Sequence, residues 1–173
     1  AIEDNGDGMS LSDLNNKYLR IGYKKRSEKN SVFVVNGKQR HVMGRKGIGK
    51  LAPFALAEEL EIQSANGRDE KVGCLIKWSE FKQAIDEDKT IFTPIPLAAS
   101  KLSIKKGTKL ILKSIRDDKK EDLRNIEVLR KRISRRFTVI YPEYDFDVKI
   151  DGESVTNKDR HYLRTFAYAG IKA

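Results

Sequence analysis

Apolar residues along the chain gather into short runs separated by polar turns, as expected of strands in a small sheet. Three of these runs have the length of buried strands. They are residues 60–64, 72–78 and 108–115. Residues 1–3 resemble the end of a further strand, because the turn-forming sequence Asp-Asn-Gly-Asp-Gly follows them. Residues 90–97 are expected to be extended, although Pro94 and Pro96 limit their pairing.

Three other segments have the periodicity of helices. Ser10 is suited to cap a helix that runs to Ile21. A helix over residues 50–58 has Pro53 in its first turn, where an N–H group has no helical partner in any case. A long helix is predicted over residues 121–140. The apolar faces comprise Leu11, Leu14, Tyr18 and Ile21 in the first helix, and Leu123, Ile126, Leu129, Ile133 and Phe137 in the long one.

The remaining segments indicate an α+β fold. Residues 144–150 alternate in polarity toward Asp151-Gly152, a dipeptide typical of a hairpin turn. Residues 22–43 are basic, polar and weakly periodic, so we expect a mobile loop. Helices and strands are mixed without a strict strand–helix–strand repeat. This order favours one sheet with helices on one of its faces.

The charge of the chain favours an anionic partner. Its 173 residues include 35 Lys and Arg against 25 Asp and Glu, which gives a net charge of +10. The excess is concentrated in residues 22–50, with nine basic residues and one acid, and in residues 101–136, with fourteen and five.

The cysteine content and the apolar runs of the sequence indicate the cellular compartment and whether the protein associates with a membrane. Cys74 is the single cysteine, lies in an apolar run and is expected to be a buried core residue. The sequence shows neither a secretory leader nor an apolar run long enough to cross a membrane. A cytoplasmic protein without a membrane partner is therefore expected.

The first motif is the turn Asp4-Asn5-Gly6-Asp7-Gly8-Met9. As a calcium loop it would place Glu3, Asn5 and Asp7 on ligand positions, but Leu14 would then replace the closing glutamate. A plain polar turn is a second interpretation. The third is a carboxylate that follows a strand, beside glycines that allow a ligand close to the backbone.

The second motif, Gly44-Arg45-Lys46-Gly47-Ile48-Gly49-Lys50, also fits more than one template. As a Walker A loop it lacks the Ser or Thr that holds magnesium, because Leu51 follows Lys50. As G-x-x-G-x-G before a helix, it provides backbone N–H groups for phosphate at a positive helix end. A flexible loop before a helix is the third interpretation. A third motif, Gly107-Thr108 before an apolar strand, is by itself only a turn that enters the strand.

Taken in order, the three motifs resemble the Bergerat-fold (GHKL) ATPases, which include DNA gyrase B subunits, the large heat-shock chaperone, sensor histidine kinases, MutL and MORC proteins. The resemblance covers roughly residues 2–150. Residues 47–57 and 107–112 are most similar to the chaperone, whereas residues 21–26 are more similar to MORC. The resemblance implies a two-layer α/β sandwich with a mixed, mostly antiparallel sheet. It also implies an ATP-binding domain over residues 1–150 and a following segment or transducer domain over residues 151–173.

The resemblance further implies the roles of single residues at a nucleotide site. Asp4 would accept a hydrogen bond from the adenine amino group, and an acceptor-only carboxylate suits that donor. Gly6 and Gly8 would let the backbone pass the base, Met9 would pack on it and Thr108 would hold its edge. Phosphate would bind backbone N–H groups of Gly44, Gly47, Ile48, Gly49 and Lys50. Lys24, Lys25, Arg45 and Lys46 lie in the presumed lid and are expected to be mostly solvated.

The family's first motif, a helix with a catalytic glutamate and a magnesium-binding asparagine, would lie upstream of Ala1. No catalytic or metal residue is therefore assigned within the chain. We expect ATP hydrolysis, with Mg²⁺, in a longer parent protein and negligible hydrolysis by this chain alone. ATP binding and hydrolysis would drive conformational change or formation of a homodimer of the parent.

The alternative function is a basic nucleic-acid-binding module of a DNA-processing or chromatin-like protein, supported by residues 119–136. Aromatic residues that would stack on bases are not interleaved with these charges, which weakens it. Phosphotransfer by a histidine is disfavoured, because no helix presents a candidate phospho-acceptor histidine upstream of the motifs. His41 and His161 are isolated, so neither indicates a metal site or a catalytic triad.

Overall fold

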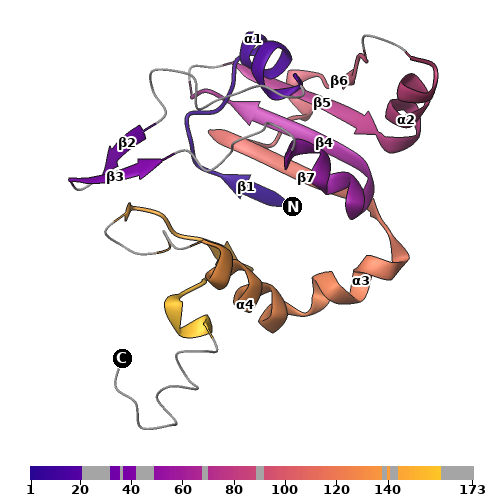
Figure 1. The fold of residues 1–173 in the computed structure, drawn as a ribbon. Coiled ribbons are helices and arrows are strands. Elements are labelled where there is room, and N and C mark those ends of the chain that lie inside the picture. Colours follow the sequence, from indigo (N-terminus) through magenta and orange to yellow (C-terminus); the bar gives the residue numbers. More distant parts are fainter. Residues whose placement is uncertain are drawn as a thin grey trace, which may run out of the picture. The chain divides into compact units, whose positions relative to one another are not determined.

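The computed structural model describes residues 1–20, 32–35, 37–41, 49–67, 70–88, 92–137, 140 and 144–160. The chain divides into two compact units, which are described separately below (Figure 1). Unit 1 comprises residues 1–25 and 44–117, and unit 2 comprises residues 26–43 and 118–173. The domain boundary predicted after residue 150 stays a prediction. None of the helices in the described ranges is long and apolar enough to cross a membrane.

Unit 1 is built on a five-stranded antiparallel sheet with the strand order β1-β7-β4-β5-β6. The strands are β1 (Ile2–Asp4), β4 (Ala57–Ala65), β5 (Lys71–Lys77), β6 (Ile95–Pro96) and β7 (Gly107–Ile115). The predicted strands and the α+β class are confirmed. Every strand pair that the structure describes is antiparallel, so the sheet of unit 1 is not mixed.

The register of the sheet separates an apolar face from a polar one. Ile62 pairs with Cys74 and Leu110 across β5 and β7, and it is completely buried. Cys74 is 4% exposed, as predicted for a core residue, and burial raises the pKa of its thiol to about 11. On the opposite face, Glu61 lies 2.6 Å from Lys113. This ion pair lowers the pKa of the Glu61 carboxyl.

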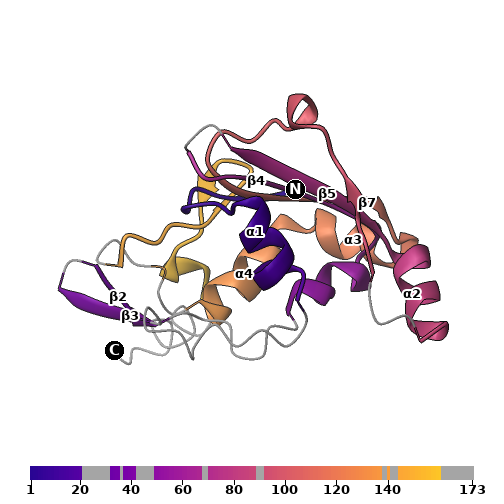
Figure 2. The same cartoon turned by 90° about the horizontal axis from the view of Figure 1, so that it is seen from above.

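Helices of unit 1 cover the apolar face (Figure 2). The first is α1 (Leu11–Asp13), which continues as the π-helix η1 (Leu14–Tyr18). Ser10 caps it as predicted, but Leu11 is 55% exposed, whereas Leu14 is buried in the core. The helix α2 (Trp78–Asp86), which the sequence did not reveal, contributes Trp78 and Phe81 to an aromatic cluster around Phe54.

The helix predicted over residues 50–58 is shorter and tighter than expected. It is the 3₁₀-helix η3 (Gly49–Ala55), and β4 begins two residues later at Ala57. Pro53 lies inside it and removes a backbone donor that a longer α-helix would use. A further short 3₁₀-helix, η4 (Ala99–Lys101), precedes β7.

Unit 2 contains two hairpins and a pair of helices. The strands β2 (Val32–Val35) and β3 (Lys38–His41) pair within the segment predicted to be a loop. The predicted long helix is instead two helices, α3 (Asp117–Arg124), which begins at the unit boundary, and α4 (Ile126–Arg136). Asn125 separates them, because its φ and ψ of −79° and 86° are not helical and its side chain accepts a hydrogen bond from the Val128 N–H.

The second hairpin of unit 2 confirms the prediction for the Asp151-Gly152 turn. The strands β8 (Lys149–Ile150) and β9 (Glu153–Ser154) are antiparallel. Both turn residues have positive φ, 50° at Asp151 and 85° at Gly152, as two-residue hairpins favour. The short 3₁₀-helix η6 (Asn157–Asp159) follows.

Candidate functional site

Residues of the first and third motifs meet in one row across the sheet of unit 1. Asp4 in β1 pairs with Thr108 in β7, and Thr108 pairs with Ser64 in β4. Paired residues of antiparallel strands project to the same face. Asp4 and Thr108, which are about a hundred residues apart in sequence, are therefore neighbours on the face that carries the core.

The Asp4 carboxylate is held by two backbone donors. Its Oδ1 accepts hydrogen bonds from the N–H of Gly6 at 2.9 Å and from the N–H of Thr108 at 3.2 Å. Its Oδ2 has no hydrogen-bond partner among the residues that the structure describes. Asp4 is exposed, so this oxygen is oriented but still able to accept a donor from a ligand.

Two glycines allow the turn to lie directly against the sheet. Gly8 has a φ of 70°, and a Cβ atom there would lie 2.0 Å from the carbonyl oxygen of Ala65. Gly107 has a φ of 89°, and a Cβ atom there would lie 2.0 Å from the carbonyl oxygen of Asp4. No side chain fits at either position, so these two glycines are required by the close approach itself.

Ser64 connects the two motifs, and the sequence alone did not single it out. Its side chain is completely buried. The Oγ accepts a hydrogen bond from the Met9 N–H at 2.9 Å and donates one to the Gly107 carbonyl at 2.9 Å. It also lies 3.3 Å from the Thr108 hydroxyl. The sequence signal that could have identified Ser64 is that it is polar at an inward-facing position of β4, after the apolar inward residues Leu60 and Ile62.

The second motif lies mainly outside the described residues, which include only Gly49 and Lys50 of it. Outside the described residues lie the other predicted phosphate contacts, Gly44, Gly47 and Ile48, and the lid residues Lys24, Lys25, Arg45 and Lys46. The Lys50 ammonium donates hydrogen bonds to the carbonyls of Tyr18, of Arg20 at 2.7 Å and of Lys17 at 3.3 Å. Desolvation lowers the pKa of this group. The Lys50 side chain therefore joins η3 to the C-terminal end of η1, where carbonyls lack helical partners.

A largely apolar cavity of about 720 Å³ lies beside Lys50. It is bounded by η1, η3, α2 and the β4–β5 part of the sheet, and its lining includes Asn16, Tyr18, Phe54 and Phe81. Asp4, Met9 and Thr108 are not part of this lining. The structure thus brings Asp4, Gly6, Gly8, Met9 and Thr108 together, but it does not gather them with Lys50 into one enclosed cavity.

Within the described parts of the chain, no group of three or more His, Cys, Asp or Glu side chains is arranged to hold a metal ion. The magnesium ligand expected upstream of Ala1 stays a prediction.

Comparison with known proteins decides the family. Residues 1–121 match the family described as "Histidine kinase-, DNA gyrase B-, and HSP90-like ATPase". The chain belongs to this family. It is thus a GHKL-type ATPase domain, a family that binds ATP, and its α+β sheet is consistent with the Bergerat fold.

One relative is 40% identical over 164 residues, which cover 94% of this chain. It is a Herpetosiphon aurantiacus protein named "Putative type II restriction enzyme HgiDII". The chain spans 25% of the length of that relative. Its name mentions neither a heat-shock chaperone nor a MORC protein, and the similarity of the motifs to those two branches stays a prediction.

Proposed function

We propose that this GHKL domain binds ATP with the adenine amino group donating to Asp4. The observation that carries the proposal is the orientation of the Asp4 carboxylate by the N–H groups of Gly6 and Thr108, with Oδ2 left to accept. Adenine presents a donor at its exocyclic amino group, and an ionised carboxylate only accepts. Met9, fixed through Ser64, would contact the ring, and the Thr108 hydroxyl would hold its edge.

The phosphates would bind the backbone N–H groups of residues 44–50. This placement rests on the glycine motif. It is also supported by the position of Gly49 and Lys50 at the start of η3, since the N–H groups at the start of a helix attract phosphate. Magnesium would neutralise phosphate charge, and hydrolysis would require the glutamate and asparagine that the resemblance places upstream of Ala1. We propose that nucleotide binding in the parent protein drives conformational change or dimerisation.

The parent protein is proposed to process DNA. The restriction-enzyme name of the relative that covers almost the whole chain supports this context. The net charge of +10 supports it independently, because a basic protein favours a polyanion. The alternative that the motif resemblance suggests is a parent protein of the heat-shock chaperone or MORC branch.

Base selectivity tests the proposed role of Asp4. Guanine presents a carbonyl oxygen where adenine presents its amino group, so two acceptors would face each other at Asp4. Isothermal calorimetry with the full-length protein should show ADP binding about five- to a hundred-and-fifty-fold tighter than GDP binding, since an acceptor left unpaired under the bound base costs roughly 1–3 kcal/mol. Equal affinity for the two nucleotides would remove Asp4 from the base site.

A further inference from the structure

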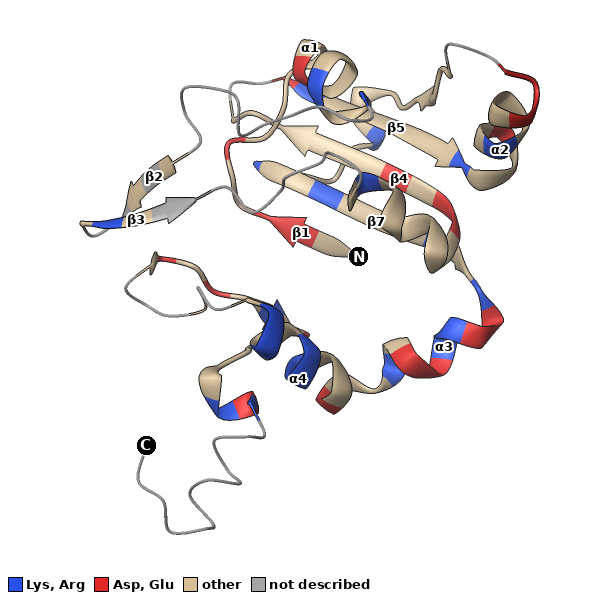
Figure 3. Ribbon diagram, in the orientation of Figure 1, with Lys and Arg blue, Asp and Glu red and all other residues tan. Residues whose placement is uncertain are grey.

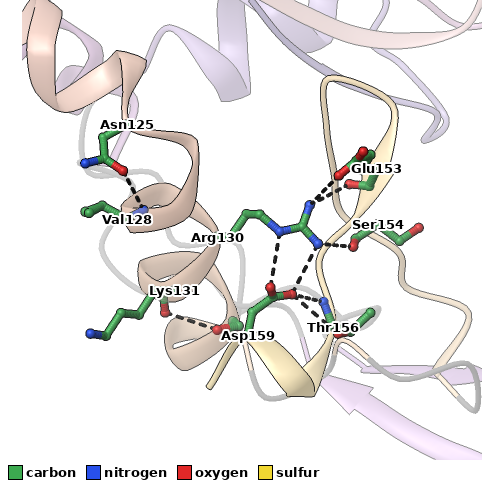
Figure 4. Close-up of polar contacts among 9 residues, drawn as sticks. Asn125, Val128, Arg130, Lys131, Glu153, Ser154, Thr156 and Asp159 are labelled. Carbon is green, nitrogen blue, oxygen red and sulfur yellow. Dashed lines mark hydrogen bonds and ion pairs between the residues drawn. The ribbon is translucent and has the colours of Figure 1, made fainter. Parts of the chain in front are cut away.

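The helix α4 carries five basic residues and one acid, Glu127, within 11 residues. One of the five, Arg130, has its hydrogen-bond partners within unit 2 (Figure 4). Its guanidinium contacts both Asp159 oxygens at 3.2 and 3.3 Å and the Ser154 carbonyl at 2.6 Å. Asp159 also accepts from the Thr156 N–H. Desolvation raises the pKa of the Asp159 carboxyl, but the bonds from Thr156 and Arg130 together outweigh it and lower the pKa. Arg130 thus tethers α4 to the β8–β9 hairpin and η6.

The other four basic residues lie on the opposite side of the helix. At about 100° per residue, Lys131, Arg132, Arg135 and Arg136 occupy an arc that faces away from Arg130. Ser134, which is buried, and Phe137, which contacts Phe146, are on the same side of the helix as Arg130. Arg132, Arg135 and Arg136 are exposed and Lys131 is half-buried. We call these four residues the α4 basic arc.

The α4 basic arc is not neutralised by neighbouring acids. None of its four side chains forms an ion pair with another residue that the structure describes. Nearby carboxylates have other partners, since Asp159 and Glu153 pair with Arg130 and Asp147 pairs with Lys149. Figure 3 shows the contrast with α3, in which acidic and basic residues are interspersed and Lys119 lies 2.6 Å from Asp118.

We propose that the α4 basic arc binds the phosphate backbone of duplex DNA without reading its sequence. Three arginines on one rigid helix face offer bidentate donors suited to phosphate. The arc contains no aromatic residue for stacking on unpaired bases, which favours a duplex over a single strand. The choice of DNA among polyanions rests on the proposed DNA-processing role, whereas the surface itself is independent of ATP binding.

The number of charges sets the expected salt dependence. Four neutralised phosphates predict that log K falls against log salt with a slope of about −3.6, so affinity should fall on the order of a hundredfold between 50 and 200 mM salt. Removing three of the charges should reduce the magnitude of that slope by about 2.7.

Fluorescence anisotropy of a labelled mixed-sequence duplex, titrated with the full-length protein over a salt series without nucleotide, tests the proposal. The test variant is R132Q/R135Q/R136Q. The matched control is K101Q/K105Q/K106Q, which removes the same net charge from exposed lysines of unit 1. We expect the test variant to lose at least tenfold in affinity and most of its slope, and the control to retain both. R132K/R135K/R136K keeps the charge and should retain the slope.

Several results would overturn the proposal. They are equal losses in the two glutamine variants, no binding of the duplex by the unchanged protein at low salt, and tighter binding of RNA or of an acidic peptide. Circular dichroism melting checks that the variants fold. Calorimetry with ADP on the same variants should give unchanged affinity, so a failure of DNA binding is distinguished from a failure of nucleotide binding.

Discussion

Gly107 lies where β7 enters the sheet against the backbone of Asp4. Any side chain at this position would have a conformational cost, because the φ is 89°. It would also clash, because its Cβ atom would lie 2.0 Å from the Asp4 carbonyl oxygen. Gly152 has a similar φ of 85° but no atom within 4 Å of its virtual Cβ. It therefore provides a control that carries only the conformational cost.

We predict that Gly107→Ala lowers the free energy of unfolding more than Gly152→Ala does. The strained φ alone should cost about 1–3 kcal/mol at both positions, and the clash should add a comparable amount at Gly107. Urea unfolding of the two variants measures the difference. Equal losses would mean that the Asp4 backbone does not approach Gly107 as closely as described.

Ser64 is the residue through which the Met9 turn and the Gly107 turn contact each other. Ser64→Ala would leave the Met9 N–H and the Gly107 carbonyl without this partner, so we predict a loss of about 1–3 kcal/mol in unfolding free energy and weaker ADP binding. Ser134→Ala is the control, because among the described residues that similarly buried hydroxyl has one partner, the Lys131 carbonyl of its own helix. Its substitution should cost less and leave ADP affinity unchanged, and the reverse order would refute this role of Ser64.

At the scale of elements, the start of α1 carries a charge-dependent cap. Ser10 and Asp13 form a capping box, and Lys17 lies 2.8 Å from the Asp13 carboxylate. The bond to Lys17, followed by those from Ser10, lowers the pKa of Asp13 from 3.8 to about 2. A lowered pKa in the folded state means that the stabilisation is complete above about pH 4 and is lost as the pH falls toward 2.

We therefore predict that Asp13→Asn destabilises unit 1 at pH 6 and that the difference from the unchanged protein shrinks between pH 4 and 2. The Asp13 side chain is 37% exposed, so solvent screening should keep the loss below about 1 kcal/mol. Thermal melting over a pH series measures it, with Asp7→Asn as the control. A loss that does not change with pH would show that the ionised carboxylate is not what stabilises this cap.

The elements that the sequence predicted are those whose own pattern determines them. The strands β4, β5 and β7 alternate or run apolar, and each forms where expected. The break of the long helix at Asn125 was missed, because an apolar period continues through it and only the local cap reveals the interruption. The hairpin of β2 and β3 was missed because the basic residues around it favoured a loop, although the apolar run Val32–Val35 followed by Asn-Gly is a typical hairpin signal.

At the scale of the whole molecule, the site depends on pairings between distant segments. Asp4, Gly8 and Thr108 could be found because their motifs are local and resemble a family. Ser64 could not, because a serine in a strand gains its role only from the register with Thr108. The prediction that residues 44–50 bind phosphate rests only on their motif, because most of them lie outside the described residues.

The chain crosses between the two units beside the glycine motif. The chain passes from unit 2 back to unit 1 between residues 43 and 44, directly before the glycine motif. It leaves unit 1 again after residue 117, at the end of the segment that begins with that motif.

The central claim, that Asp4 binds adenine, is tested most directly by calorimetric titration of ADP into the full-length protein carrying Asp4→Asn. The amide would replace an acceptor-only carboxylate, and the lost charge-assisted bond predicts a decrease in affinity of about 2–3 kcal/mol, or roughly thirty- to a hundred-and-fifty-fold. Asp7→Asn removes the same charge from an exposed residue of the same turn and should leave the affinity within about twofold, as expected for a surface change. Equal ADP affinity of the Asp4→Asn variant and the unchanged protein would contradict the claim.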